Sequence, residues 1–348
     1  MALISVIMAT YNTPKEYLER AINSILTQSF HDFEFIIIDD CSSSNDQEVI
    51  KSFKDSRINF YRNEKNLGLA ASLNRGLGMA NGKYIARMDA DDISLRNRLE
   101  IQYKFLEENK HIDVVSSFAK QFGERNNFII SPYIDDKEID IQLLFGNTIC
   151  HPTVMFRKEF MKKNDLKYNE NFKSGQDYEL WTRCLKVGKF SIIPKVTLYY
   201  RTHNKQISVS KKDGQIRNTQ KIYMNQLRDL GFLGSENEIN LHYEFCNSSS
   251  CKAENIKDFI EWGNNLIERN KEIKRYDDRL LRRCISYTLF KKLIRTIRQE
   301  KLHCTKEIVN SKADILSLLK VNTLFNNTKY VKYLLKSKIE TSKYLKSI

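Results

Sequence analysis

Short apolar segments alternate with amphipathic segments over residues 3–118 of the chain. Five apolar segments are typical of buried parallel strands: Leu3–Ala9, Phe33–Ile38, Ile58–Tyr61, Tyr84–Met88 and Val114–Phe118. Between them, apolar residues recur at helical spacing after Pro14, over Leu69–Ala80 and over Leu95–Glu108. The alternation predicts an α/β fold, with a mostly parallel sheet and helices on both of its faces.

The pattern changes after Phe118 and again at Ile216. Short strands are predicted at Thr153–Phe156, Phe190–Ile193 and Val196–Tyr200, around a helix at Tyr178–Val187. From Ile216 onward the sequence is helical throughout. We therefore expect a domain of residues 1–215, with halves 1–118 and 119–215, followed by a helical region of residues 216–348.

Polar side chains recur where three of the predicted strands end. They form the clusters Thr10-Tyr11-Asn12, Asp39-Asp40 and Asp89 to Asp92. Because ligands of open α/β sheets bind at the carboxyl ends of the strands, we expect these clusters to converge on one crevice.

Several carboxylates at one crevice repel one another unless a cation lies among them. The spacing Asp89-x-Asp91, with Asp92 beside it, offers hard oxygen ligands that suit Mg²⁺ or Mn²⁺. The competing structural interpretation makes Asp92 or Ser94 the cap of a helix that begins at Leu95. For Asp39-Asp40 the competing interpretation is a strand-end turn in which Asp bonds its own backbone.

Positive charge is concentrated in the last third of the chain. The 348 residues carry a net charge of +14, and residues 241–348 account for 23 Lys+Arg against 12 Asp+Glu. A basic helical region of this kind favours an anionic surface, such as the inner leaflet of a membrane. Nucleic-acid binding is an alternative, although no recognition motif supports it. An ordinary solvated basic face explains the charge equally well.

The cysteines and the apolar segments indicate in which cellular compartment the protein is expected and whether it is expected to bind zinc. Seven cysteines at irregular spacing, without a secretory signal, indicate reduced thiols in the cytoplasm. No apolar segment approaches the ~20 residues that span a bilayer. Cys246 and Cys251 lie near His242, but no second ligand pair follows, so we expect no zinc site.

Five segments together resemble family 2 glycosyltransferases, which have the Rossmann-like glycosyltransferase-A fold. They are SVIMATYN (5–12), SILTQSF (24–30), IIDDCS (37–42), NLGLA (66–70) and ANGKYIARMDADD (80–92). The resemblance covers roughly residues 1–205. It implies an inverting enzyme that binds a UDP-sugar and a divalent cation.

The resemblance also implies roles for individual residues. Asp40 reads the uracil imide with Asp39 as a less direct companion, and Asp91 is the first choice for the metal. The remaining nucleotide-sugar residues are Ala9, Tyr11, Asn66, Gly68, Arg75, Asp89, Ala90, Arg201 and His203. Of these, Asp89 and His203 are also expected to contact the metal.

The acceptor half supplies the expected general base. The segment GQDYELW (175–181) resembles the family's Glu-Asp-Tyr-x-Leu-Trp, whose Asp takes the acceptor proton, so the resemblance makes Asp177 the base. Gln176 stands where Glu is usual, which puts acceptor contacts in doubt. Asp177 is also explained by favourable charge placement at a helix N-terminus. His151-Pro152-Thr153 is expected to line the acceptor cleft, with a structural turn as the competing interpretation.

The predicted function is therefore metal-dependent transfer of a single sugar from a UDP-sugar. The acceptor would be a hydroxyl of a glycan or of an undecaprenyl-diphosphate-linked oligosaccharide, in bacterial capsule, exopolysaccharide or O-antigen synthesis. The alternatives are a sugar-nucleotide-binding protein without transferase activity and a nucleic-acid-binding protein. A nucleotidylyltransferase is disfavoured, because Thr10 to Pro14 replace its Gly-rich phosphate loop. Donor sugar, acceptor and oligomeric state remain open.

Overall fold

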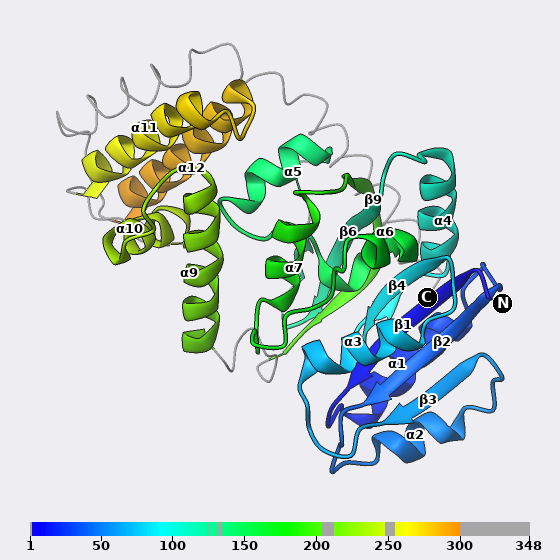
Figure 1. Cartoon of the computed structure of the whole chain (residues 1–348). Coiled ribbons are helices and arrows are strands. Elements are labelled where there is room, and N and C mark those ends of the chain that lie inside the picture. Colours follow the sequence, from blue (N-terminus) through cyan, green and yellow to red (C-terminus); the bar gives the residue numbers. More distant parts are fainter. Residues whose placement is uncertain are drawn as a thin grey trace. The chain divides into compact units, whose positions relative to one another are not determined.

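The computed structural model describes residues 2–124, 126–129, 131, 134–203, 212–247 and 255–299 (Figure 1). The chain divides into two compact units. The first contains Met1–Ile139 and Thr148–Gln215, and the second contains Asp140–Asn147 and Ile216–Ile348. Residues 300–348, which are part of the predicted basic helical region 216–348, and Cys251 lie outside the described residues.

A nine-stranded sheet forms the centre of the first unit. Its order is β3-β2-β1-β4-β8-β6-β9-β5, with β7 paired to β6. The strands are β1 (Ile4–Thr10), β2 (Phe33–Asp39), β3 (Ile58–Arg62), β4 (Tyr84–Asp89), β5 (Ile93–Ser94), β6 (Val114–Gly123), β7 (Phe128–Ile129), β8 (Met155–Arg157) and β9 (Phe190–Thr202). Strands β5, β7 and β8 run against the other strands. The predicted α/β fold with a mostly parallel sheet is confirmed.

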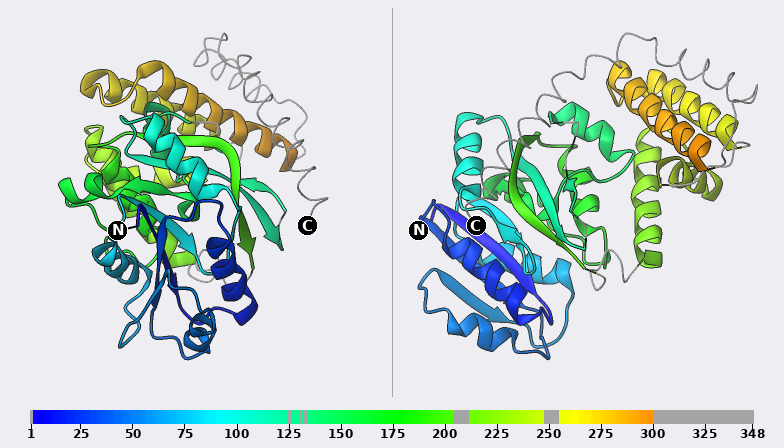
Figure 2. Two further views of the ribbon diagram at one scale, coloured as in Figure 1. Left: turned by 90° about the vertical axis from the view of Figure 1, so that its right-hand side faces the viewer. Right: turned by 180° about the vertical axis from the view of Figure 1, so that it is seen from behind.

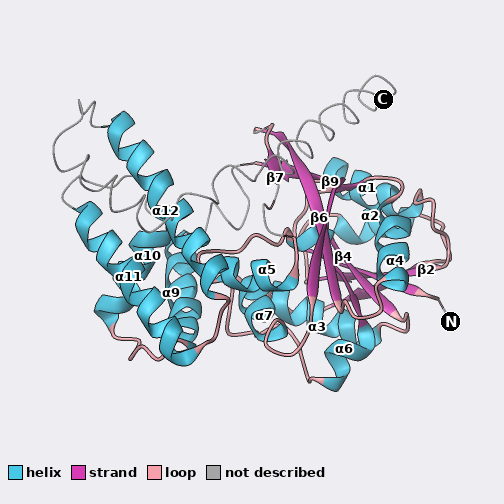
Figure 3. Ribbon diagram, turned by 90° about the horizontal axis from the view of Figure 1, so that it is seen from above, coloured by secondary structure: helices cyan, strands magenta, loops and turns pink. Residues whose placement is uncertain are grey.

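Helices cover both faces of this sheet. Helices α1 (Lys15–Leu26), α2 (Asp46–Ser52) and α4 (Arg98–Glu108) lie on one side, and α3 (Leu69–Met79) and α7 (Gln176–Cys184) on the other (Figure 3). Alternate residues of the strands, such as Val6, join the core beneath α1, α2 and α4. On the opposite face α3 packs closely on β1, where a Cβ on Gly76 would lie 2.6 Å from Ile7 Cγ2.

The structure differs from the predicted elements in several respects. Helices α2, α5 (Asp136–Leu143) and α6 (Lys158–Lys163) and the two-residue strands β5 and β7 were not predicted, because short elements carry little periodic signal. His151–Thr153 form a 3₁₀ turn, as the competing interpretation of that segment predicted. The two strands predicted at residues 190–200 form one strand, β9, with a register shift against β6 near Phe118. Strand β8 lies between β4 and β6 in the sheet. This position depends on pairing between segments that are far apart in the sequence, so local patterns do not predict it. Helix α4 begins at Arg98 rather than Leu95.

The second unit is helical over its described residues. Helices α9 (Lys212–Asp229), α10 (Glu236–Asn247), α11 (Ile256–Ile273) and α12 (Asp278–Gln299) follow one another, and α9 begins within the first unit. Helices α11 and α12 lie side by side (Figure 2). Among the described residues, no helix combines the length and the apolar character that crossing a bilayer requires.

Residues 140–147 belong to the second unit although they lie within the sequence region assigned to the first. The Asp140 carboxylate accepts two hydrogen bonds from Arg275, at 2.6 and 2.9 Å. The carbonyl of Leu144 accepts a hydrogen bond from His242 Nε2 (2.8 Å), and that of Phe145 accepts one from the Tyr223 hydroxyl (3.3 Å). The second unit therefore includes Asp140–Asn147, a segment that precedes Ile216 in the sequence.

His242 is a structural residue of this unit. It is fully buried, and its Nδ1 accepts a hydrogen bond from Trp262 Nε1 (3.1 Å) while its Nε2 donates to Leu144. Both ring nitrogens are thereby used in the neutral tautomer, which leaves none for a metal. In the described part of the chain, only Asp89, Asp91 and Asp92 form a group that could hold a metal ion.

Burial lowers the pKa of His242 from 6.5 to about 4, so we expect the helical unit to lose stability in acid. The unfolded chain binds a proton near pH 6.5 and the folded chain near pH 4. Stability is therefore complete above pH 6.5 and falls by about 3 kcal/mol as the pH approaches 4. Hydrogen exchange of α10 and α11 amides, converted to opening free energies, measures this loss.

A His242→Gln variant serves as the comparison, because an amide side chain can donate and accept but does not titrate. Its opening free energy should depend much less on pH than that of the unaltered protein. His111→Gln, at an exposed histidine of the first unit, is the matched control and should retain the full dependence. Equal pH dependence in the unaltered and His242→Gln proteins would contradict this prediction.

Candidate functional site

Strand register brings the three predicted polar clusters together. Strand β1 lies between β2 and β4, so that Ala9 is paired with Ile38 on one side and with Asp89 on the other. Thr10 is in turn paired with Asp39. The carboxyl ends of β1, β2 and β4 therefore lie at one edge of the sheet, as the sequence predicted.

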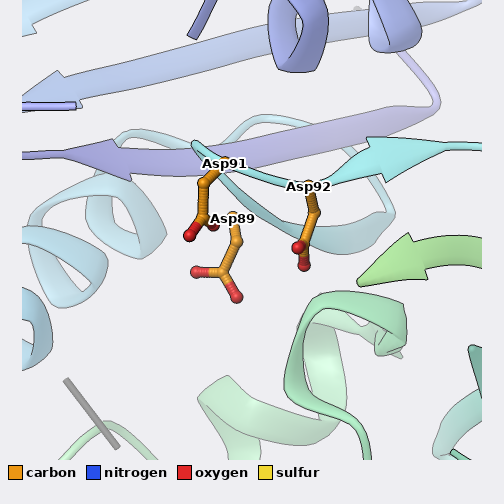
Figure 4. A group of neighbouring side chains, drawn as sticks. All are labelled: Asp89, Asp91 and Asp92. Carbon is orange, nitrogen blue, oxygen red and sulfur yellow. The ribbon is translucent and has the colours of Figure 1, made fainter. Parts of the chain in front are cut away.

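Asp89, Asp91 and Asp92 form the carboxylate cluster at this edge. Their side chains point to the same side of the turn between β4 and β5 (Figure 4). One oxygen from each lies within 4.8 Å of the others. Asp92 is buried, whereas 28% of the Asp89 side chain and 27% of the Asp91 side chain are exposed.

The cluster is electrostatically strained. Burial and the charge of Asp89 raise the pKa of Asp91, and the contact with His203 opposes that rise. Burial raises the pKa of Asp92 well above its ordinary value, with further contributions from Asp91 and Asp89. The ionised cluster is thus destabilised by desolvation and mutual repulsion, which a nearby positive charge would relieve.

Two buried arginines supply part of that positive charge. Arg87 is 2% exposed, and its Nη1 forms an ion pair with Asp89 Oδ1. Arg98 is fully buried and donates from Nη1 to the carbonyls of Arg87 (3.0 Å) and Pro152. Burial and the neighbouring Arg87 lower the pKa of Arg98 to about 10.

The cluster also fits a divalent cation. Asp92 Oδ2 is a buried acceptor without a hydrogen-bond donor. Three carboxylates from one short turn, partly open to solvent, match the hard oxygen ligands of Mg²⁺ and Mn²⁺, which commonly take only one or two carboxylates together with phosphates. Asp91 and Asp89 are more exposed than Asp92, so they are the carboxylates that a cation from solvent would reach first.

The alternative interpretation of Asp92 as a helix cap is wrong. Asn97, not Asp92, directly precedes α4, and Ser94 lies in β5. Asp92 Oδ1 instead accepts a hydrogen bond from the backbone N–H of Arg201, at 2.8 Å.

The end of β9 holds the turn that carries the cluster. Arg201 Nε donates to the carbonyl of Asp91 (2.7 Å), and His203 Nε2 lies 3.0 Å from Asp91 Oδ2. The structure thus places His203 beside Asp91, the first choice for the metal. The Arg201 side chain contacts the backbone of Asp91, whereas the resemblance implied that Arg201 contacts the nucleotide.

The two aspartates at the end of β2, Asp39 and Asp40, have different hydrogen-bond partners. Asp39 is fully buried, accepts a hydrogen bond from the N–H of Ser42 (2.8 Å), and pairs with Arg62 at 3.1 Å. Asp39 therefore forms the strand-end turn that was the alternative to a ligand-binding role for this pair. Asp40 instead accepts hydrogen bonds from the backbone N–H groups of Leu67 (2.9 Å) and Gly68 (2.8 Å).

The predicted loop residues surround Asp40. Asn66 Nδ2 donates to the Asp40 carbonyl at 3.4 Å, and Gly68 adopts a φ of +92°, which favours glycine. Arg75 donates from Nη1 to the carbonyl of Arg62 (2.8 Å) and to Asn63 Oδ1 (2.6 Å). Arg75 therefore supports this loop through Asn63.

Tyr11 and Ala90 complete the predicted nucleotide set. Tyr11 is 53% exposed at the end of β1, so its ring is available to a ligand. Ala90 is 7% exposed between the two aspartates, where a larger side chain would crowd the turn.

Asp177 lies in the first turn of α7, after Gly175 in the left-handed conformation (φ +70°). Burial raises the pKa of Tyr168 and of Cys150, and the charges of Asp177 and Asp89 add to both rises. Asp177 and the carboxylate cluster therefore act on the same buried groups. His151, also predicted at the acceptor cleft, is buried, and its Nε2 lies 2.8 Å from the Tyr168 hydroxyl.

The sequence analysis did not identify Arg87, Asn63 or Tyr17. Strand alternation could have revealed Arg87, because residues two apart on a strand share a face and Asp89 follows it by two. Asn63 Nδ2 donates to Asp40 Oδ1 (2.7 Å), but it carries no local signal. The ring of Tyr17 lies 3.8 Å from Arg201 Cζ, a contact between residues distant in sequence.

Comparison with known proteins identifies relatives of this chain. Residues 5–164 match the family model described as glycosyl transferase family 2. The chain is 41% identical over 217 residues to the uncharacterized glycosyltransferase MJ1057 of Methanocaldococcus jannaschii, which covers 60% of this chain and 74% of the relative. It is 30% identical over 246 residues to the Escherichia coli UDP-Glc:alpha-D-GlcNAc-diphosphoundecaprenol beta-1,3-glucosyltransferase WfaP, covering 70% of this chain and 92% of WfaP.

A solved structure shares the fold. Residues 1–349 of S. aureus TarS in complex with UDP-GlcNAc align with a TM-score of 0.57 at 18% identity. The alignment covers 91% of this chain and 89% of the TarS chain. At this identity the similarity concerns the fold alone.

We expect Mn²⁺ to stabilise the first unit through the carboxylate cluster. A saturating concentration should raise the melting temperature of the metal-depleted protein by about 5 °C, because a ligand bound only to the folded state stabilises it. Asp91→Asn should abolish this rise, since it removes a ligand charge, and should not lower the melting temperature of the metal-free protein. Differential scanning fluorimetry measures both effects.

Glu108→Gln is the matched control for removal of one negative charge. Glu108 is an exposed residue in the last turn of α4. This variant should keep the full response to Mn²⁺. An equal response in Asp91→Asn would show that the cation binds elsewhere.

Proposed function

Because the chain belongs to glycosyltransferase family 2, we propose that it transfers a single sugar from a UDP-sugar to a hydroxyl group, with inversion at the anomeric carbon. The observation that carries this proposal is the convergence of the strand ends. The Asp40 loop and the carboxylate cluster lie at one edge of the sheet, on either side of β1. A nucleoside diphosphate needs such a pair of sites, one for its base and one for its phosphates.

The nucleotide would bind along the ends of β1 and β2. Tyr11 offers an exposed ring to the uracil, and Ala9 leaves room beside it. The Asp40 oxygen Oδ2 accepts a hydrogen bond from the N–H of Gly68, and its second lone pair can accept one from an imide N–H. Asp39 would not contact the nucleotide itself. It would support the site through its hydrogen bond to Ser42 in the loop after β2.

Asp91 and Asp89, with His203 beside Asp91, would hold Mg²⁺ or Mn²⁺. A bound cation of this kind neutralises the charge of the leaving diphosphate. Arg87 would keep Asp89 oriented toward the same space, since their ion pair is buried on the Arg87 side.

Asp177 would act as the general base. Its carboxylate takes the proton of the acceptor hydroxyl as that oxygen attacks the anomeric carbon, and UDP departs from the opposite face. Inversion follows, because the new bond forms opposite the one that breaks. The position of Asp177 in the first turn of α7 also stabilises its negative charge.

A lipid-linked or growing bacterial surface glycan is the proposed acceptor. WfaP is named for a UDP-glucose donor, a diphosphoundecaprenol-linked acceptor and a β-1,3 product. By analogy, this chain would act at the cytoplasmic face of a membrane, in the assembly of capsule, exopolysaccharide or O-antigen.

The test is UDP release from a panel of UDP-sugars with Mn²⁺ or Mg²⁺. We expect slow, metal-dependent hydrolysis of one donor by the unaltered protein. Asp177→Asn should lower kcat about 10²–10⁴-fold, because the general base is lost. The affinity for UDP should change by less than about twofold, since a base contributes to turnover and not to nucleotide binding.

Glu159→Gln separates the base from a helix-dipole effect. Glu159 is an exposed acid in the first turn of α6, as Asp177 is in the first turn of α7. This control should retain full activity. UDP binding without turnover on any donor or acceptor would favour a sugar-nucleotide-binding protein, and absence of UDP binding would point to another nucleotide.

A further inference from the structure

Arg201 is held in a sandwich of two aromatic rings. Its Cζ lies 3.8 Å from the ring centroid of Tyr17 in α1 and 4.3 Å from that of Phe122 in β6. Both distances are within the range of cation–π contacts. Arg201 is only 7% exposed. A guanidinium confined in this way has little freedom to move toward a ligand.

Two N–H groups of Arg201 donate hydrogen bonds to the turn of the carboxylate cluster. Nε donates to the Asp91 carbonyl at 2.7 Å, and the backbone N–H donates to Asp92 Oδ1 at 2.8 Å. His203, two residues later, contacts the carboxylate of Asp91. Asp91 is thus held at its carbonyl and at its carboxylate by the end of a strand 110 residues away in sequence.

From this geometry we propose that Arg201 is a positioning residue for the cation site. The sandwich of Tyr17, Arg201 and Phe122, here called the Arg201 clamp, fixes the backbone of Asp91 and so the direction of its carboxylate. The proposal rests on the proposed function, in which Asp91 binds the cation. It differs from the role that the resemblance implied for Arg201, a contact with the nucleotide.

The clamp explains why an arginine occupies this position. The planar guanidinium presents two faces to the rings while its Nε–H points along the plane to a carbonyl. Lysine would keep the charge but lose both the stacking and the fixed direction of the donor. Groups that orient metal ligands without touching the metal commonly change metal affinity 10–100-fold when they are altered.

Two variants test the clamp in the full chain. Arg201→Lys removes the stacking at the arginine, and Tyr17→Leu removes one ring and leaves Arg201 in place. Mn²⁺ affinity is measured without nucleotide, by electron paramagnetic resonance of free Mn²⁺. UDP affinity is measured at saturating Mn²⁺ by calorimetry. Tyr17→Phe, which keeps the ring, is the matched control.

We expect both variants to weaken Mn²⁺ binding about tenfold. UDP affinity at saturating Mn²⁺ should change by less than about twofold, and Tyr17→Phe should bind Mn²⁺ as the unaltered protein does. The double variant Arg201→Lys/Tyr17→Leu should bind Mn²⁺ no more weakly than Arg201→Lys alone, because the two residues act through one contact. If Arg201→Lys fails to fold, Tyr17→Leu and its Tyr17→Phe control carry the test.

Other outcomes overturn the proposal. Loss of UDP affinity at saturating Mn²⁺ with unchanged Mn²⁺ affinity would make Arg201 a nucleotide contact. Unchanged Mn²⁺ affinity in both variants would make the sandwich a packing feature only. If the unaltered protein binds UDP but no Mn²⁺, the cation assignment itself fails and the clamp fails with it, whereas absence of UDP binding alone would count against the proposed function only.

Discussion

The repulsion among three carboxylates at one sheet edge is the constraint on which the site depends. Asp89, Asp91 and Asp92 follow one strand within four residues, and one oxygen of each lies within 4.8 Å of the others. Burial strengthens their repulsion, because fewer water molecules screen the charges. The arrangement is stable only with positive charge nearby, and Arg87 supplies the first of it through a buried ion pair with Asp89.

The surrounding elements are arranged to hold this strained turn. Strand β9 runs beside β6 and ends with Arg201 and His203 at Asp91, and β5 pairs with the same strand. Helix α1 contributes Tyr17 to the position of Arg201. Backbone and side-chain contacts from three separate parts of the chain therefore fix a turn of a few residues, which pre-organises its carboxylates for a cation.

The loop around Asp40 is held by a separate set of hydrogen bonds. Asp40 is bonded to the backbone of the loop at Leu67 and Gly68 and to Asn63, which in turn is bonded to Arg75. The carboxylate that the resemblance assigned to the uracil thus also shapes the loop beneath it.

The two halves of the sheet differ in how far local sequence defines them. The strands β1 to β4 are continuous apolar segments, and their pairing follows from the right-handed connections that α/β units adopt. The position of β8 between β4 and β6, and the continuous β9 through Pro194, depend on contacts between segments far apart. The second unit likewise includes Asp140–Asn147, from the middle of the chain. Hydrogen bonds from Arg275 and His242, more than 90 residues later in the sequence, hold this segment in the unit.

The sequence by itself determined the fold class, the strands β1 to β4 and the acidic residues that gather where strands end. It could do so because apolar periodicity and the convergence of parallel strand ends are local or topological properties. Only the tertiary structure decided between the two interpretations of Asp39, which turns back on its own loop, and showed that Asp92 bonds to Arg201 and caps no helix and that Arg201 lies against Tyr17 and Phe122. The contacts of Asp92 and Arg201 depend on which distant side chain fills the neighbouring space, and no local pattern in the sequence shows which one does.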